Sequence, residues 1–185
     1  DSLEYAWDKV IYPMIPEIYR VMKNHTWGVV WFGSQHYQKI VSALETLSGK
    51  VKTGKGFNVN PVPHIWYKTN KGGSQNNPDL VELNQYEPFL RIRKGDPRLF
   101  KKAVGNVLAY PMDTGSDREH FAQKTEAVMS DILERYTFGS MHVIDPTYGR
   151  GMVFLAAKKL GRTFSGAEAN KENRERAVRG LREGV

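Results

Sequence analysis

From residue 141 to the end, the chain alternates short apolar runs with segments of helical periodicity, and this order constrains the fold more than any other feature. The runs are short and rich in β-branched and aromatic residues, which is typical of strands. Strands are expected over 141–144 and 163–167, and helices over 152–160 and 171–181. Strands that alternate with helices of this length pair in parallel and carry helices on both faces, so the predicted class is α/β with a mostly parallel sheet.

The upstream half has a less regular pattern. Residues 3–23 carry apolar positions at helical spacing, but Pro13 and Pro16 predict a kink or two helices there. Residues 27–32 are apolar throughout, which predicts a strand buried on both faces at the centre of a sheet. Helices are also expected over 37–47 and 120–136, strands over 64–68, 86–93 and 106–110, and loops over 50–63 and 69–79. The length of 185 residues suits a single domain, 1–185, with a loop-rich basic insert at 50–118.

Charge and cysteine content narrow the classes of partner and site. Lys and Arg number 27 against 20 Asp and Glu, a net charge of +7 that favours a polyanion such as DNA. The candidate DNA contacts lie in two basic stretches, although such stretches can also be solvated loops: Lys50, Lys52, Lys55, Lys68, Lys71, Arg91, Arg93 and Lys94. The absence of cysteine excludes disulfides and thiolate metal sites and is typical of a cytoplasmic protein. No apolar run approaches the ~20 residues of a membrane helix.

A glycine-containing turn follows the strand expected at 141–144. It reads Asp145-Pro146-Thr147-Tyr148-Gly149-Arg150-Gly151, and Glu168 follows seventeen positions later, at the end of the next strand. Glycine lets the backbone approach a ligand closely, and an acid at the second strand end can accept hydrogen bonds from both ribose hydroxyls. The third glycine of the dinucleotide fingerprint is replaced by Phe154. The pattern therefore favours a nucleoside cofactor without a pyrophosphate, such as S-adenosylmethionine, over a plain turn.

Residues 143–168 resemble the cofactor motif of amino-methyltransferases that act on DNA. The family pattern is Asp-Pro-Phe-x-Gly-x-Gly-Thr, then Ala-Ala-x-x-Leu-Gly-Arg, then Gly-x-Glu, and this chain differs at Thr147 and Met152. The segment from His120 to Thr125 is similar to the family element His-Pro-x-x-Lys-Pro. The resemblance implies a Rossmann-like methyltransferase fold and contacts with S-adenosylmethionine. The implied cofactor residues are Asp145, Pro146, Thr147, Gly149, Gly151, Glu168, His120 and Lys124, although the last two also fit a polar helix N-terminus.

The function implied by the resemblance is methyl transfer from S-adenosylmethionine to an exocyclic amino group of DNA, with N6 of adenine as the expected target, as in restriction-modification systems. Glu168 would bind the ribose, and Asp145 would lie near the methionine amine. Methylation of N4 of cytosine or of RNA, and a non-catalytic nucleic-acid-binding relative, remain alternatives. The oligomeric state stays open between monomer and homodimer.

The catalytic residues are unknown at this stage. Because the cofactor motif comes last, the order is that of the permuted group, whose catalytic tetrapeptide Asp/Asn/Ser-Pro-Pro-Tyr/Phe/Trp would precede Leu3. The expectation is a fragment or an incomplete N-terminus, with loss of catalysis as a third explanation. Residues 145–148 resemble the tetrapeptide, but the glycines and the acid that follow assign them to the cofactor turn.

Overall fold

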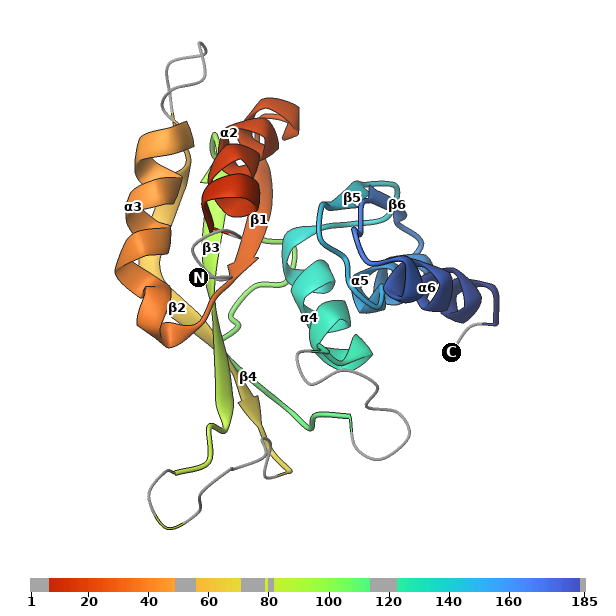
Figure 1. Cartoon of the computed structure of the whole chain (residues 1–185). Helices are drawn as coiled ribbons and strands as arrows, with labels where there is room; N and C mark the ends of the chain where they lie inside the picture. The colour runs from red at the N-terminus through yellow and green to blue at the C-terminus, as the bar shows by residue number, and fades with distance from the viewer. Residues whose placement is uncertain (1–6, 49–55, 71–78, 80–81, 114–122, 184–185) are drawn as a thin grey trace. The chain divides into compact units, whose positions relative to one another are not determined.

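The structure is a computed structural model that describes residues 7–48, 56–70, 79, 82–113 and 123–183 (Figure 1). The chain forms two compact units. Unit 1 comprises residues 1–66 and 87–98, and unit 2 comprises residues 67–86 and 99–185. The region 50–118 therefore contributes to both units, and its described residues contain three strands, β2, β3 and β4.

Unit 1 begins with a helix whose geometry changes along its length. A π-helical turn, η1 (Trp7–Ile11), leads directly into the α-helix α2 (Tyr12–Val21), with Pro13 in its first turn and Pro16 inside it. Proline removes a donor from the helix and its ring crowds the preceding turn. The helical segment is thus divided between Ile11 and Tyr12, next to Pro13, whereas α2 continues through Pro16 without a break.

The strands of the larger sheet are β1 (Thr26–Trp31), β2 (Asn58–Lys68), β3 (Tyr86–Lys94) and β4 (Val107–Tyr110), in the order β1-β3-β2-β4. β1 pairs antiparallel with β3 and is the outermost strand of this described sheet, so the expected central position of residues 27–32 is wrong. All of its residues are half-buried. Its apolar run has another cause: Val30 packs on the helical core, whereas Trp31 on the opposite face contacts the ring of Phe89.

β2 is longer than the sequence indicates. Residues 58–63 were expected to belong to a loop because of the Gly, Lys and Asn content of residues 50–63, but they continue the strand. β2 lies between β3 and β4 in the sheet, but β4 has 4 residues against 11 in β2, so β4 can pair with only part of β2, and proline is tolerated where one side of a strand carries no ladder. Val59 packs against the core, and the Tyr37 hydroxyl donates to the Pro61 carbonyl at 2.6 Å. These contacts fix the segment as a strand.

The core of unit 1 lies between the sheet and two helices. The 3-10 turn η2 (Ser34–His36) leads into α3 (Tyr37–Ser48), which lies with α2 on one face of the strands (Figure 1). The buried cluster consists of Trp7, Ile15, Tyr19, Ile40, Ala43, Leu44, Phe57, Leu90 and Ile92. The opposite face of the sheet carries polar and aromatic side chains of β1, β2 and β3.

Unit 2 contains the alternating elements expected from the sequence. They are α4 (Glu126–Tyr136), β5 (His142–Asp145), α5 (Met152–Lys159), β6 (Thr163–Gly166) and α6 (Lys171–Glu183). β5 and β6 pair in parallel, from His142↔Thr163 to Asp145↔Gly166. The α/β class is confirmed, but the strands are mixed in direction rather than mostly parallel, since β1 and β3 are antiparallel.

The start of α4 differs from the expected helix at 120–136. Thr125 is the N-cap: its backbone is extended, and its hydroxyl accepts a hydrogen bond from the Val128 N–H at 3.3 Å. Such a cap satisfies one of the donors that a helix start leaves unpaired. Lys124 therefore precedes the helix.

α4 also carries a buried ion pair. The Arg135 guanidinium donates to both carboxylate oxygens of Asp131, at 3.1 and 2.8 Å, and both side chains are buried. Lys101 donates to Asp131 at 3.1 Å and to the half-buried Glu134 at 3.0 Å, and Arg135 also donates to the Gly105 carbonyl. The loop before β4 is thereby anchored to α4.

No described helix combines the length and the apolar character needed to cross a membrane. No group of three or more His, Cys, Asp or Glu side chains within the described ranges has the arrangement of a metal site.

Candidate cofactor site and basic surface

The turn at residues 145–151 is tied to the end of the neighbouring strand. The Asp145 carbonyl accepts from the Ala167 N–H at 3.2 Å, and the Ala167 carbonyl accepts from the Tyr148 N–H at 3.3 Å. Within the turn, the Thr147 N–H donates to the Asp145 carboxylate at 2.9 Å. The turn thus lies at the carboxyl ends of two parallel strands, where open α/β sheets bind ligands.

Glu168 faces the turn, as the sequence predicted. One carboxylate oxygen accepts from the Gly149 N–H at 2.9 Å, and the other accepts from the Asn170 N–H at 2.8 Å. An ionised carboxylate offers about four lone-pair positions, so these two bonds occupy about half of them. The side chain is held in one orientation and retains acceptor capacity for two further donors.

The two glycines of the turn have different roles. Gly149 has φ +55°, and nothing lies within 4 Å of the position that a Cβ would take. Gly151 has φ +79°, and a Cβ there would lie 2.9 Å from the Ala177 Cβ on α6. Gly149 therefore opens the backbone to a ligand, whereas Gly151 allows α6 to pack closely.

Gly166 is a site residue that the sequence reasoning did not select. A Cβ at this position would lie 2.0 Å from the Asp145 carbonyl oxygen and 2.7 Å from Cζ of Phe154. The Phe154 ring stacks on Phe164 at a centroid distance of 4.9 Å. Phe154 occupies the position of the third fingerprint glycine, and Gly166 makes room for its ring from the strand. The Gly-x-Glu signature ending at Glu168 was the signal that could have identified it.

Two carboxylates share this site, and their proximity affects the ionisation of one of them. Burial raises the pKa of Asp145 above its ordinary value, and the negative charge of Glu168 raises it further. The hydrogen bond from the Thr147 N–H acts in the opposite direction. The turn therefore presents an acidic surface, which suits a cationic ligand and opposes a pyrophosphate.

The remaining predicted cofactor residues are placed as follows. Pro146 and Thr147 lie in the turn itself, and Lys124 lies just before the N-cap of α4 in the same unit. His120 falls outside the described residues.

The predicted DNA contacts divide into three groups. Lys50, Lys52, Lys55 and Lys71 fall outside the described residues. Lys68 is buried, with 8% of its surface exposed. The Lys94 ammonium donates to the carbonyls of Tyr19 and Met22, both at 2.7 Å, at the C-terminal end of α2. A cation at this position compensates the unpaired carbonyls of a helix end, so Lys94 serves the fold.

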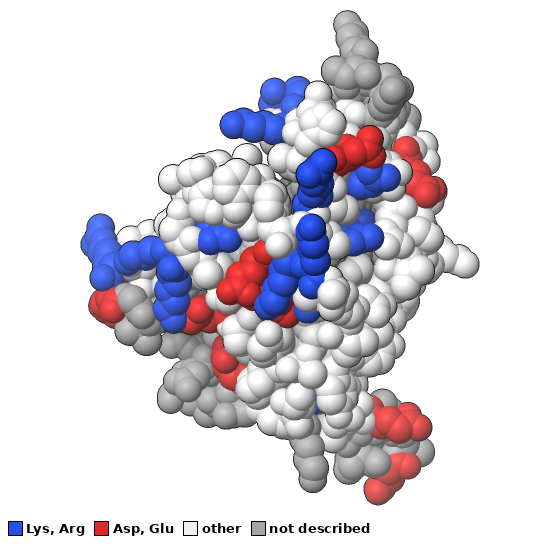
Figure 2. All heavy atoms as spheres, turned by 180° about the vertical axis from the view of Figure 1, so that it is seen from behind, with Lys and Arg blue, Asp and Glu red and all other residues white. Residues whose placement is uncertain are grey.

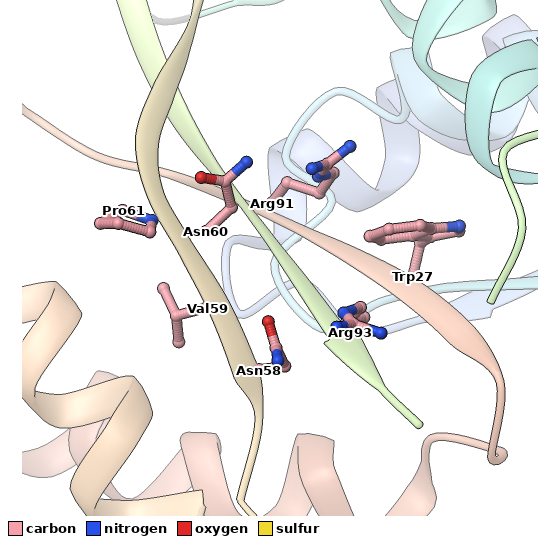
Figure 3. A pocket seen from close by; sticks show the side chains of 7 residues that line it. All are labelled: Trp27, Asn58, Val59, Asn60, Pro61, Arg91 and Arg93. Carbon is pink, nitrogen blue, oxygen red and sulfur yellow. The ribbon is translucent and has the colours of Figure 1, made fainter. Parts of the chain in front are cut away.

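Arg91 and Arg93 line a shallow pocket on the sheet face opposite α2 and α3. Its volume is about 400 Å³. The lining residues are Trp27, Asn58, Val59, Asn60, Pro61, Arg91 and Arg93. Figure 3 shows the arginines, Trp27 and the two asparagines on one side of the strands, with Val59 and Pro61 directed to the other. The Arg91 guanidinium lies 4.8 Å from the centroid of the Trp27 ring.

Basic and acidic side chains are interspersed on the surface. Figure 2 shows groups of Lys and Arg side chains with Asp and Glu among them. Arg93, for example, pairs with Asp96, and Lys159 pairs with Glu126. On the face shown in Figure 2, the described cations are therefore interspersed with acids and do not form one continuous basic surface.

Comparisons with known proteins agree with this geometry. The family model described as DNA methylase matches residues 2–179. "Putative methylase YubD" of Escherichia coli strain K12 is 25% identical over 161 residues, which are 87% of this chain and 64% of that protein. The structure described as the M1.HpyAVI–SAM complex has a TM-score of 0.77 at 23% identity and covers 94% of this chain and 83% of its own. The cytosine-N4-specific PvuII DNA methyltransferase has a TM-score of 0.72 at 12% identity, with coverages of 91% and 68%. The resemblance found in the sequence is confirmed, and the chain belongs to the N6/N4 DNA methylase family.

Proposed function

We propose that the 145–151 turn and Glu168 bind S-adenosylmethionine, and that the protein transfers its methyl group to an exocyclic amino group of a DNA base. The observation that carries this proposal is the contact between the Gly149 N–H and the Glu168 carboxylate, beside the open space at Gly149. Family membership supports it, as does the likeness to M1.HpyAVI, whose structure is described as a SAM complex.

The residues of the turn fit this cofactor. Glu168 retains acceptor capacity for the two ribose hydroxyls, and Gly149 allows close approach because it has no Cβ. The acidic pair formed by Asp145 and Glu168 favours a cation. S-adenosylmethionine carries a sulfonium and an amine, and an ammonium near Asp145 would relieve the repulsion between the two carboxylates.

When bound, the cofactor supplies an activated methyl group on its sulfonium. Transfer to an amine requires alignment of the nitrogen with that methyl group and acceptors that stabilise the developing positive charge. The described residues would meet the first requirement on the cofactor side: Glu168 and the Gly149 backbone would hold the nucleoside in one orientation. The acceptors for the target amine are not assigned to residues of this chain.

A calorimetric titration with S-adenosylmethionine and with its demethylated product tests the cofactor site. Glu168→Ala is expected to weaken binding at least about 100-fold, since it removes two hydrogen bonds to a charged acceptor and each is worth roughly 1.5–3 kcal/mol. Glu168→Gln retains one acceptor oxygen and is expected to lose less. Glu45→Ala, an exposed acid on α3, is the matched control. Absence of binding by the wild-type protein, or equal binding by Glu168→Ala, would refute the assignment.

We propose N6 of adenine as the target, and N4 of cytosine is the second candidate because the cytosine-N4-specific PvuII enzyme shares the fold. The full-length protein is incubated with duplex DNA and labelled cofactor, and the digested nucleosides are identified by mass spectrometry. Label in N6-methyladenine supports the first target, and label in N4-methylcytosine refutes it in favour of the second. RNA is tested in parallel. Cofactor and DNA binding without transfer to any substrate would instead indicate a non-catalytic relative.

A further inference from the structure

A second pocket lies beside the cofactor turn, along the outer face of α6. Its volume is about 550 Å³, and all of its lining residues belong to unit 2. They are Tyr148, Arg174, Glu175, Val178, Arg179 and Arg182. Tyr148 comes from the turn, and the other five come from one helix, so the pocket is formed where the turn meets α6.

The helix exposes this face because its other face is occupied. Ala177 is buried against Gly151, whereas Arg174, Val178 and Arg182 follow each other at intervals of four residues. Side chains at this spacing form one row along a helix. Val178 is 44% exposed, and the Tyr148 ring is supported by Phe154 at a centroid distance of 4.9 Å. This face of α6 therefore presents arginine side chains next to the apolar surfaces of Val178 and Tyr148.

The charges on this face are not balanced. Glu175, the acid of the pocket, forms an ion pair with Lys171 at 3.8 Å, and one Arg174 nitrogen donates to the carbonyls of Glu168 and Ala169. Arg179 and Arg182 have no ion pair or hydrogen bond within the described ranges, and both are exposed. The charges around this helix also act on the neighbouring Arg150: burial lowers its pKa, the positive charges of Arg176 and Arg179 lower it further, and the negative charge of Glu172 raises it.

The dimensions of the row match a strand of nucleic acid. From Arg174 to Arg182 the helix rises ~12 Å, at 1.5 Å per residue. Phosphates along one strand of duplex DNA are spaced by about 3.4 Å of axial rise, so a row of this length laid along the duplex axis would span about three nucleotide steps. A single free phosphate group would engage only part of it. Arginine recognises phosphate oxygens through paired N–H donors.

We propose that the outer face of α6, with Arg179 and Arg182 as its main cations, binds the phosphate backbone of the nucleic-acid substrate beside the cofactor turn. This inference rests on the proposed function, since it assumes a nucleic-acid substrate. It adds a second contact surface in unit 2 to the candidate arginines of β3. The contacts it supplies are independent of base sequence, so they would contribute affinity and orientation.

The test compares salt-dependent binding of a labelled DNA duplex by the wild-type protein, by Arg179→Gln/Arg182→Gln and by Lys9→Gln/Lys23→Gln. The control removes two exposed lysines of unit 1 and changes the net charge equally. Loss of two phosphate contacts is expected to make the slope of log K against log salt shallower by about 1.8, at ~0.9 per contact. Affinity near 100 mM salt should fall at least tenfold, while S-adenosylmethionine binding and the thermal midpoint stay unchanged.

The inference and the proposed function fail in different ways. An unchanged slope in the arginine variant, with normal DNA and cofactor binding by the wild type, would overturn the inference alone. An equal loss of DNA affinity in the lysine control would show that the effect depends on net charge alone, and this would overturn the inference. A loss of S-adenosylmethionine affinity in the arginine variant would assign the pocket to the cofactor site and would overturn it as well. Variant-sensitive binding of free AMP or of phosphatidylserine vesicles, without that of DNA, would also overturn it. Failure of the wild type to bind any nucleic acid would refute the substrate assignment itself.

Discussion

Replacing Gly166 with alanine should damage both the fold of unit 2 and its cofactor site. The new Cβ would lie 2.0 Å from the Asp145 carbonyl oxygen, 2.7 Å from Cζ of Phe154 and 3.0 Å from the Asp145 carbonyl carbon. Ordinary C···O contacts in proteins are about 3.3 Å or longer, so the strands must separate by roughly 1.3 Å. Two of the three contacts are with backbone atoms, which a side-chain rotation cannot relieve.

The expected loss of unfolding free energy in Gly166→Ala has two contributions. Adding a methyl group to a packed interior typically costs about 1–3 kcal/mol. Separation at the Asp145↔Gly166 position also breaks the 3.2 Å hydrogen bond from the Ala167 N–H to the Asp145 carbonyl, worth about 1 kcal/mol net. The total is about 2–4 kcal/mol. In a protein of this length, about 3 kcal/mol lowers the midpoint of thermal unfolding by about 6–12 °C.

Thermal and urea unfolding measure the loss of stability, and calorimetry with S-adenosylmethionine measures the change in cofactor affinity. Gly139→Ala is the matched control because nothing lies within 4 Å of its Cβ position, and it should change the free energy of unfolding by about 0.5 kcal/mol or less. Gly166→Ala should also weaken cofactor binding, since Glu168 follows the displaced strand end. Equal unfolding midpoints for the two variants would refute the steric argument.

Two further predictions concern buried carboxylates. Burial opposes ionisation of Asp131, but hydrogen bonds from Arg135 and Lys101 hold its pKa below the ordinary value. Its stabilisation is therefore complete above the unfolded pKa of about 3.9 and is lost as the pH falls through the lower folded pKa. Asp131→Ala should cost about 3–5 kcal/mol at pH 7 by urea unfolding. Glu134→Ala, at a side chain that is 43% exposed, should cost about 1 kcal/mol or less, and equal losses would contradict the burial argument. Asp145 has a raised pKa, so its ionisation destabilises the fold as the pH rises above the unfolded value. Asp145→Asn should then raise the thermal midpoint at pH 7 but not at pH 3, while weakening cofactor binding; a lower midpoint at pH 7 would contradict this.

The local sequence pattern was sufficient to predict most helices and strands of unit 2. The helices at α5 and α6 and the strands at β5 and β6 lie within two residues of the expected bounds. Short-range periodicity determines these elements, and the parallel pairing of β5 with β6 follows from the helix between them. The facing positions of the turn and Glu168 follow in turn, because parallel strands end at the same edge of a sheet.

The sequence was less informative where long-range contacts decide the outcome. An apolar run cannot distinguish a central strand from an outer strand whose second face is covered by aromatic rings, as in β1. The Gly, Lys and Asn content of residues 50–63 concealed the first half of β2, because these residue types are uncommon in strands and only the packing of Val59 on the core shows that the segment is part of the sheet. Helix α4 starts later than its periodicity suggests, at a cap that only the backbone geometry reveals.

By itself, the sequence determined the α/β class, the family resemblance and the pairing of a glycine turn with a distant acid, because each depends on residues close in the chain or on a recognisable motif. The tertiary structure decided which basic side chains remain exposed and able to contact a ligand. Lys94 stabilises the end of α2, and Lys68 is buried, whereas Arg179 and Arg182 remain exposed. The type of a side chain is written in the sequence, but its exposure and its hydrogen-bond partners depend on segments that only folding brings together.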